Sequence, residues 1–120
     1  YDISPDSEDE TAALASAYIK DKKPTFTFIH FDHVDHGGHE YGHGSPEYYK
    51  SVEKADAMLA EVMAAIKASG MADETLVIIS ADHGGLGKGH GGESLQEIEI
   101  PFILWGKSVK KHLWPGLENP

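Results

Sequence analysis

The strongest constraint on the fold is the order of two apolar runs and one long amphipathic stretch. Residues 25–31 are β-branched and aromatic, and residues 75–80 form a continuous apolar run, so both are typical of buried strands. Between them, residues 49–66 carry apolar side chains at helical spacing. Strand, helix and strand in this order predict a right-handed βαβ unit with two parallel strands. We therefore expect an α/β fold.

The expected boundaries of the helices follow from capping residues. Ser45 and Pro46 are suited to the N-cap and first position of the long helix, and Gly70 to its C-cap. Residues 7–10 have the spacing of a capping box. Three further elements are expected: a helix at residues 11–20, a helical turn at residues 94–97 and a third strand at residues 100–105.

Each of the first two strands runs into a segment rich in glycine, histidine and aspartate. These segments, residues 32–44 and 81–92, are predicted to be loops. Since parallel strands end at the same edge of a sheet, both loops should leave its carboxyl edge, where open α/β sheets bind their ligands. We therefore expect the two loops to be neighbours.

The composition limits the chemistry of this edge. The chain has 120 residues, a formal net charge of −10 with histidine neutral, and no basic stripe, which argues against a nucleic-acid-binding surface or an anionic membrane surface. It has no cysteine, so disulfides and thiolate metal sites are excluded. No apolar run approaches the roughly 20 residues that span a bilayer. A phosphate substrate is possible if bound cations supply positive charge locally.

Five residues of the two loops are candidate metal ligands. Asp35 and His39 stand four positions apart, and the two glycines between them disfavour a regular helix and let both side chains reach one point. Asp82 and His83 directly follow a predicted strand, and His90 lies among glycines. Nitrogen and oxygen donors in this number fit zinc best, with manganese or iron possible.

Other interpretations of the same residues stay open. Asp-Gly and His-Gly pairs are common turn formers, so either loop alone could be only a turn. Asp32 could replace Asp35 as a ligand, although its spacing to His39 is less suitable. Lys88 could contact a phosphoryl oxygen or simply be solvated. Three histidines are assigned to the surface or to contacts behind the ligands: His33, His36 and His43.

Two sequence motifs resemble those of a known family. Residues 31–42 read Phe-Asp-His-Val-Asp-His-Gly-Gly-His-Glu-Tyr-Gly and resemble the Asp-x-x-Gly-His-x-x-Gly element of type I phosphodiesterases and nucleotide pyrophosphatases. Residues 80–85 read Ser-Ala-Asp-His-Gly-Gly and resemble the strand-end Asp-His-Gly element of the alkaline phosphatase superfamily. His90, followed by residues 99–103, is similar to the family's later histidine and next strand. The resemblance covers roughly residues 24–111.

The resemblance implies a division of the ligands between two zinc ions. Asp35, His39 and His90 would bind one ion, and Asp82 and His83 the other. In the family the second ion also takes an aspartate from an earlier strand and a threonine or serine nucleophile. No segment here matches those two elements, so no catalytic nucleophile is assigned and the chain alone is not expected to catalyse turnover.

The resemblance also implies a fold and an activity. It predicts a three-layer α/β/α fold with a mainly parallel sheet, in which residues 1–120 are the carboxyl-side part of a single alkaline-phosphatase-like metallohydrolase domain. The parent protein would be secreted or periplasmic and would hydrolyse small-molecule phosphate monoesters or diesters through a dinuclear zinc site and a covalent phosphoenzyme. A sulfatase, a phosphosugar mutase of the same superfamily and a non-catalytic metal-binding fragment are the alternatives.

Overall fold

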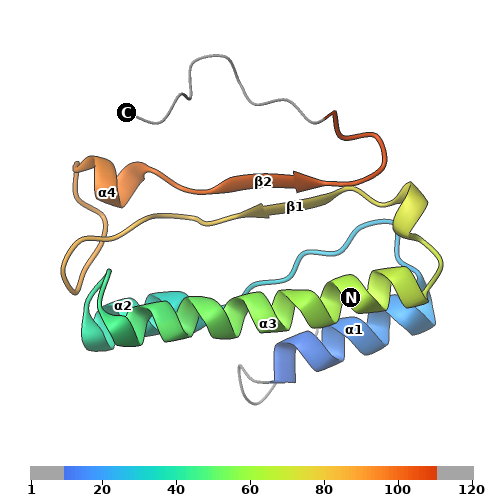
Figure 1. Ribbon diagram of the computed structural model, residues 1–120, viewed down its shortest axis with the longest axis horizontal. Coiled ribbons are helices and arrows are strands. Elements are labelled where there is room, and N and C mark those ends of the chain that lie inside the picture. The colour runs from blue at the N-terminus through green and yellow to red at the C-terminus, as the bar shows by residue number, and fades with distance from the viewer. Residues whose placement is uncertain (1–9, 111–120) are drawn as a thin grey trace.

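Helices dominate residues 10–110, the part of the chain that the computed structural model describes. A helical layer lies on one side and a small sheet on the other (Figure 1). The elements in chain order are α1 (Thr11–Lys22), α2 (His33–Tyr41), α3 (Pro46–Ala68), the 3-10 helix η2 (Ala72–Glu74), β1 (Val77–Ser80), α4 (Leu95–Ile98) and β2 (Phe102–Trp105).

The core lies where α1 packs against α3. Its buried apolar side chains are Ala12, Ile19, Met58, Val62, Ala65 and Ile66. Small residues on α1, including Ser16 at 2% exposure, allow the two helices to approach closely. Ile29, Phe31 and Val77 pack against this core from the other segments. The apolar stripe predicted for the long helix is therefore confirmed in its second half, whereas Tyr49 remains 57% exposed.

The ends of α3 follow the capping chemistry expected for them. The Ser45 hydroxyl accepts a hydrogen bond from the backbone N–H of Tyr48 at 3.1 Å, and Pro46 occupies the first turn. At the other end the C-cap is Ser69, and Gly70 follows it with a φ of 80°, in the left-handed region that favours glycine. The prediction for this helix is confirmed, with the glycine one position beyond the C-cap.

The predicted N-terminal helix and helical turn are also present. The first is α1, which ends where Lys23 takes a φ of 46° and donates its N–H to the carbonyl of Ile19. Residues 7–9 of its predicted capping box lie outside the described residues, and the N-cap Glu10 makes no side-chain capping bond. The second is α4, one residue later than predicted.

The predicted first strand is absent from the described structure. Residues 25–31 run without a ladder of backbone hydrogen bonds. Residues 25–28 are all exposed, with Phe26 at 83% and Phe28 at 78%, while Ile29 and Phe31 pack on the core. The prediction was wrong because β-branched and aromatic composition favours a strand but cannot supply the neighbouring strand that its backbone groups need. The parallel βαβ unit is therefore not formed.

The sheet that does form has two antiparallel strands. β1 pairs with β2 in the register Ile78 to Leu104 and Ser80 to Phe102. A mainly parallel sheet is thus not found among the described residues. The segment between β1 and β2 turns back through α4, so the second strand returns beside the first in the opposite direction (Figure 1).

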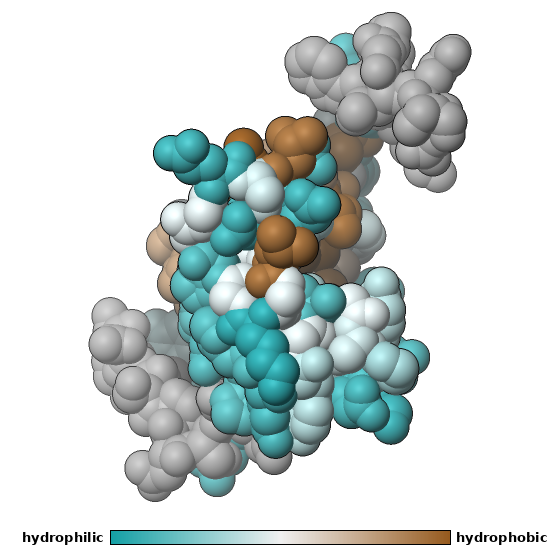
Figure 2. All heavy atoms as spheres, turned by 90° about the vertical axis from the view of Figure 1, so that its left-hand side faces the viewer, coloured by the Kyte–Doolittle hydropathy of each residue, from teal (hydrophilic) through white to brown (hydrophobic). Residues whose placement is uncertain are grey.

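The outer face of this sheet is apolar. Directly paired residues of antiparallel strands share a face, which places Ile78 with Leu104 and Phe102 with Ser80 on the face opposite Val77. Ile78, Leu104 and Phe102 are 56%, 42% and 67% exposed, respectively. Figure 2 views the end of the molecule where α2 and α4 lie: the helical half is largely hydrophilic, and hydrophobic residues gather in the half with the strands.

The segment predicted to be the first glycine-rich loop contains helix α2. Gly37 and Gly38 lie inside this helix and are buried. A Cβ atom at Gly37 would overlap the Ser51 side chain of α3. The prediction of a loop was wrong because these glycines allow α2 to pack closely on α3, and this packing outweighs their low helix propensity.

Candidate metal centre

Helix α2 presents two of the predicted ligands on one face. Asp35 and His39 are one helical turn apart, so their side chains meet, with 3.4 Å between Asp35 Oδ2 and His39 Nε2. The expectation that both reach one point holds, although the backbone achieves this as a helix and not as an irregular loop.

The other three predicted residues come from the segment after β1. His83 Nε2 lies 3.8 Å from Asp35 Oδ1 and 3.6 Å from Asp82 Oδ2. His90 Nε2 lies 3.6 Å from Asp35 Oδ1. The rings of His83 and His90 stack with centroids 3.7 Å apart, and the His39 ring is 5.0 Å from that of His90. The structure therefore brings all five predicted residues together.

The tightest group within this cluster is Asp35, His83 and His90. One potential ligand atom from each lies within 4.8 Å of the others. His39 and Asp82 adjoin the group through Asp35 and His83, respectively. This group combines residues that the resemblance divides between two ions, and the division stays a prediction.

One oxygen of Asp35 is buried without a hydrogen bond. Among the described residues, Oδ1 has no hydrogen-bond partner, and the two imidazole nitrogens that face it are at 3.6 and 3.8 Å, beyond hydrogen-bond distance. Leaving such a group unsatisfied costs about 1–3 kcal/mol or more when it is charged. Tetrahedral zinc with bonds of about 2.0–2.2 Å holds two ligand atoms about 3.4 Å apart. The spacing and the unsatisfied oxygen both fit a cation between these side chains.

Backbone carbonyls orient two of the imidazoles. His39 Nδ1 lies 2.9 Å from the carbonyl of Lys88, and His83 Nδ1 lies 2.8 Å from that of Gly84. In the tautomer with hydrogen on Nδ1, each ring donates to its carbonyl and turns an unprotonated Nε2 toward Asp35. Metal-binding histidines are commonly held this way.

Helix α4 fixes the path of the second ligand segment. The N–H groups of Gly84 and Gly85 donate to the carbonyls of Glu97 and Gln96, both at 2.8 Å. A Cβ atom at Gly84 would overlap the Gln96 carbonyl, so only glycine permits this approach. The loop and the short helix therefore pack backbone against backbone.

Glu97 is a supporting residue that was not predicted for the site. Its carboxylate accepts hydrogen bonds from the Ser94 hydroxyl at 2.6 Å and the Gly92 N–H at 2.9 Å, close in sequence to His90. These bonds, first that from Ser94 and then that from Gly92, lower the pKa of Glu97. The Ser-x-x-Glu spacing of residues 94–97 is the signal that could have identified it.

The alternative candidates lie away from the cluster or have other contacts. Asp32 occupies the N-cap position of α2 without a side-chain capping bond and lies 3.9 Å from His30, and the exposed His36 lies 3.3 Å from Glu40. The Lys88 ammonium donates to the carbonyl of Glu40 at 2.9 Å, which ties it to the end of α2.

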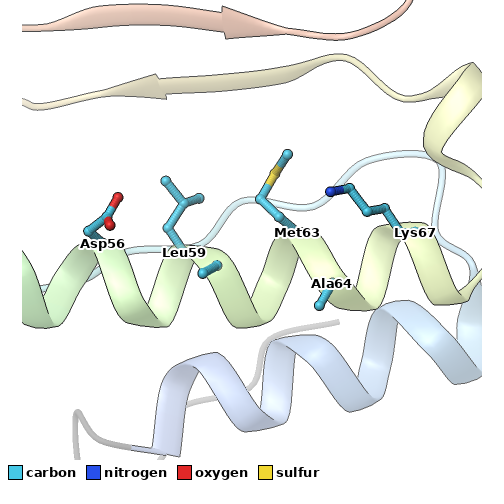
Figure 3. A pocket seen from close by; sticks show the side chains of 6 residues that line it. Asp56, Leu59, Met63, Ala64 and Lys67 are labelled. Carbon is cyan, nitrogen blue, oxygen red and sulfur yellow. The ribbon is translucent and has the colours of Figure 1, made fainter.

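The open groove along α3 is not the candidate site. It measures about 380 Å³, and Figure 3 shows Leu59, Met63 and Lys67 extending from α3 toward the strands. None of the five clustered residues lines it.

No helix among residues 10–110 has the length and apolar character needed to cross a membrane.

Sequence comparison identifies the class of protein to which this chain belongs. Residues 4–87 match the family described as "Type I phosphodiesterase / nucleotide pyrophosphatase", and the chain belongs to this family. The family is part of the alkaline phosphatase superfamily, so the resemblance seen in the motifs is confirmed. Its members act on phosphate esters.

Particular relatives are GPI ethanolamine phosphate transferases. The chain is 36% identical over 104 residues to GPI ethanolamine phosphate transferase 3 of Schizosaccharomyces pombe, covering 86% of the chain and 10% of the relative. It is 31% identical over 94 residues to GPI ethanolamine phosphate transferase 1 of Mus musculus, covering 77% and 10%. The chain thus spans about a tenth of the length of these relatives. No solved structure gives a significant match.

Proposed function

We propose that this chain supplies metal ligands to an enzyme that cleaves a phosphate ester bond. Membership of a family that acts on phosphate esters supports the reaction class. The convergence of two carboxylates and three imidazoles from α2 and the segment after β1 supports the metal site. The proposed ion is zinc, with manganese or iron as alternatives.

The single observation that carries the proposal is the environment of Asp35 Oδ1. This oxygen is buried, makes no hydrogen bond among the described residues and faces the Nε2 atoms of His83 and His90. A carboxylate is expensive to hold in this way without a cation. An ion there would satisfy the oxygen and use imidazole nitrogens already turned toward it.

Charge gives the bound metal its role. The chain carries a formal charge of −10, so an anionic phosphate ester is repelled unless positive charge is concentrated at the site. When bound, the metal supplies that charge and polarises the phosphoryl group. The family resemblance implies that Asp35, His39 and His90 hold one zinc ion and that Asp82 and His83 contribute to a second, whereas the geometry favours an ion among Asp35, His83 and His90. A dinuclear site and a covalent phosphoenzyme remain part of the proposal for the whole protein.

The relatives favour group transfer as a second candidate for the overall reaction. They are ethanolamine phosphate transferases, whereas the motifs alone suggested a hydrolase. Transfer and hydrolysis break the same kind of phosphoester bond and differ in whether a hydroxyl group or water accepts the phosphoryl group. The chain's ligands would serve either reaction, so the choice of acceptor depends on the whole protein.

The outer face of the sheet supports a proposal about the complete domain. A sheet with apolar side chains on both faces is typical of a sheet covered by helices on both sides. Ile78, Phe102 and Leu104 are apolar and exposed on the face opposite Val77. We therefore retain the three-layer α/β/α arrangement with a mainly parallel sheet as a proposal for the complete domain. A structure of a longer chain in which this face stays solvent-exposed would contradict it.

Two measurements test the proposed function. Calorimetric titration of the 120-residue chain with zinc should show binding that Asp35→Asn removes and that His36→Ala, an exposed histidine of the same helix, leaves within about twofold. In protein containing the complete family domain, Asp35→Asn should abolish turnover of a phosphodiester substrate. Zinc binding unaffected by Asp35→Asn would contradict the site, and full turnover by the variant would contradict its role in the reaction.

A further inference from the structure

His43 lies between the two segments that carry the clustered ligands. Its ring is so close to Gly38 of α2 that a Cβ atom there would overlap it. A Cβ atom at Gly85, in the segment after β1, would overlap the same ring. Gly38 adjoins His39, and Gly85 is two residues from His83. One imidazole therefore sets the separation of two backbones, each next to a proposed ligand.

Two hydrogen bonds fix His43 in this position. Its backbone N–H donates to the carbonyl of Gly87 at 2.7 Å, and its Nδ1 lies 3.1 Å from the same oxygen. The Tyr48 ring packs against it with centroids 5.3 Å apart. The imidazole is thus held by the Gly87 carbonyl and by the Tyr48 ring.

We propose that His43 is a positioning residue that sets the spacing of the metal site. The inference rests on the proposed function, because it concerns the same site. His43 does not belong to the tightest group of potential ligand atoms, Asp35, His83 and His90, and its Nδ1 is engaged by a backbone carbonyl. It therefore acts through the ligands: without its ring, α2 and the segment after β1 are free to change their separation, and the ligand atoms lose their preset spacing.

Zinc calorimetry on single variants gives the first test. His43→Ala should weaken zinc binding by about 10- to 100-fold, the usual effect of removing a residue that orients ligands. His36→Ala is the control, because it removes an exposed histidine from the neighbouring helix α2 and should change affinity by less than about twofold. Circular dichroism of each variant confirms that the helices persist.

A double-mutant cycle tests whether the His43 ring sets the separation of the two segments. Gly85→Ala places a methyl group where the ring lies, so it should expel His43 and weaken zinc binding about as much as His43→Ala does. In the His43→Ala background that space is vacant, and Gly85→Ala should have no further effect. Because coupled effects are not additive, losses that instead multiply in the double variant would contradict the proposal.

Cobalt(II) spectroscopy separates a positioning residue from a ligand. At saturating cobalt, His43→Ala should keep the wild-type d–d absorption, since the number and type of ligands are unchanged, whereas His90→Ala should alter it. A spectrum of His43→Ala that matches that of His90→Ala would overturn the proposal by making His43 a ligand.

The outcomes distinguish this inference from the proposed function. Failure of the wild-type chain to bind zinc or cobalt would remove the proposed site and this inference with it. Binding that is lost in Asp35→Asn but unchanged in His43→Ala would leave the site standing and refute only the role of His43. The positioning role of His43 is supported by three results together: His43→Ala weakens zinc binding, Gly85→Ala has no further effect on affinity in that background, and the cobalt spectrum is unchanged.

Discussion

Replacing Asp35 by Asn separates a metal ligand from a structural carboxylate. The amide keeps the shape of the side chain and removes its charge. Without metal, the carboxylate oxygen Oδ1 is buried and unsatisfied among the described residues, a situation that costs about 1–3 kcal/mol. Asp35→Asn should therefore leave the metal-free stability unchanged or raise it by up to about 1 kcal/mol, a part of that cost.

Adding zinc should make the wild type more stable than Asp35→Asn. At a free zinc concentration of about 100 times Kd, the wild type gains about 2.7 kcal/mol from binding. For a domain of this size, about 4 °C per kcal/mol converts that gain into a rise of about 10 °C in Tm. The variant, which lacks the central carboxylate, should rise by no more than about 2 °C on the same scale.

Thermal unfolding followed by circular dichroism, with and without zinc, measures both effects. His36→Ala serves as the control and should show the full zinc-dependent rise. The reasoning is refuted if Asp35→Asn shows the same rise as the wild type. It is equally refuted if the metal-free variant is several kcal/mol less stable, because Asp35 would then be a structural residue whose partners were misjudged.

Three further predictions concern the support of the site and of α3. Gly84→Ala should lower the free energy of unfolding in urea by about 1–3 kcal/mol, because its methyl group overlaps the backbone carbonyl of Gln96. A smaller loss would show that α4 can shift freely. The pKa of Glu97 is lowered, first by its hydrogen bond from Ser94, so its carboxylate contributes stability that is present above the ordinary pKa of 4.5. This stability is lost as pH falls through the lower pKa of the folded state. Amide exchange near α4 should accelerate over that pH range, and Glu97→Gln should remove this pH dependence. Ser45→Ala should lower stability by about 1 kcal/mol in urea unfolding while leaving zinc affinity unchanged, and a large change in affinity would mean that the start of α3 also shapes the site.

Local chemistry made part of the fold predictable. The Ser45 cap, Pro46 and the glycine after α3 act within a few residues, so the bounds of that helix follow from the sequence. The Ser-x-x-Glu spacing likewise identifies the start of α4. The strand expected at residues 25–31 failed because strand pairing depends on distant segments, which composition does not specify.

In the candidate site, too, local sequence predicted some features, and distant contacts determined the others. The residue types and the spacing of Asp35 and His39 led to the cluster, although the helix that joins them was missed, because the packing of Gly37 on Ser51 is a tertiary contact. The stacking of His83 on His90 could not be foreseen, since the path between them depends on the α4 backbone. Motif spacing thus identified the side chains that meet, whereas their grouping depends on tertiary contacts.

The apolar outer face of the sheet has a practical consequence for every measurement on this chain. Among residues 10–110, β1 and β2 each pair along one edge only, and Phe26, Phe28 and Phe102 present large exposed rings. Unpaired strand edges beside exposed aromatic surface favour self-association between copies. The apparent molecular mass from light scattering should therefore rise with protein concentration, and Phe102→Lys should suppress that rise without touching the histidine cluster. Metal titrations are best made with this variant or at high dilution, where each copy binds zinc on its own.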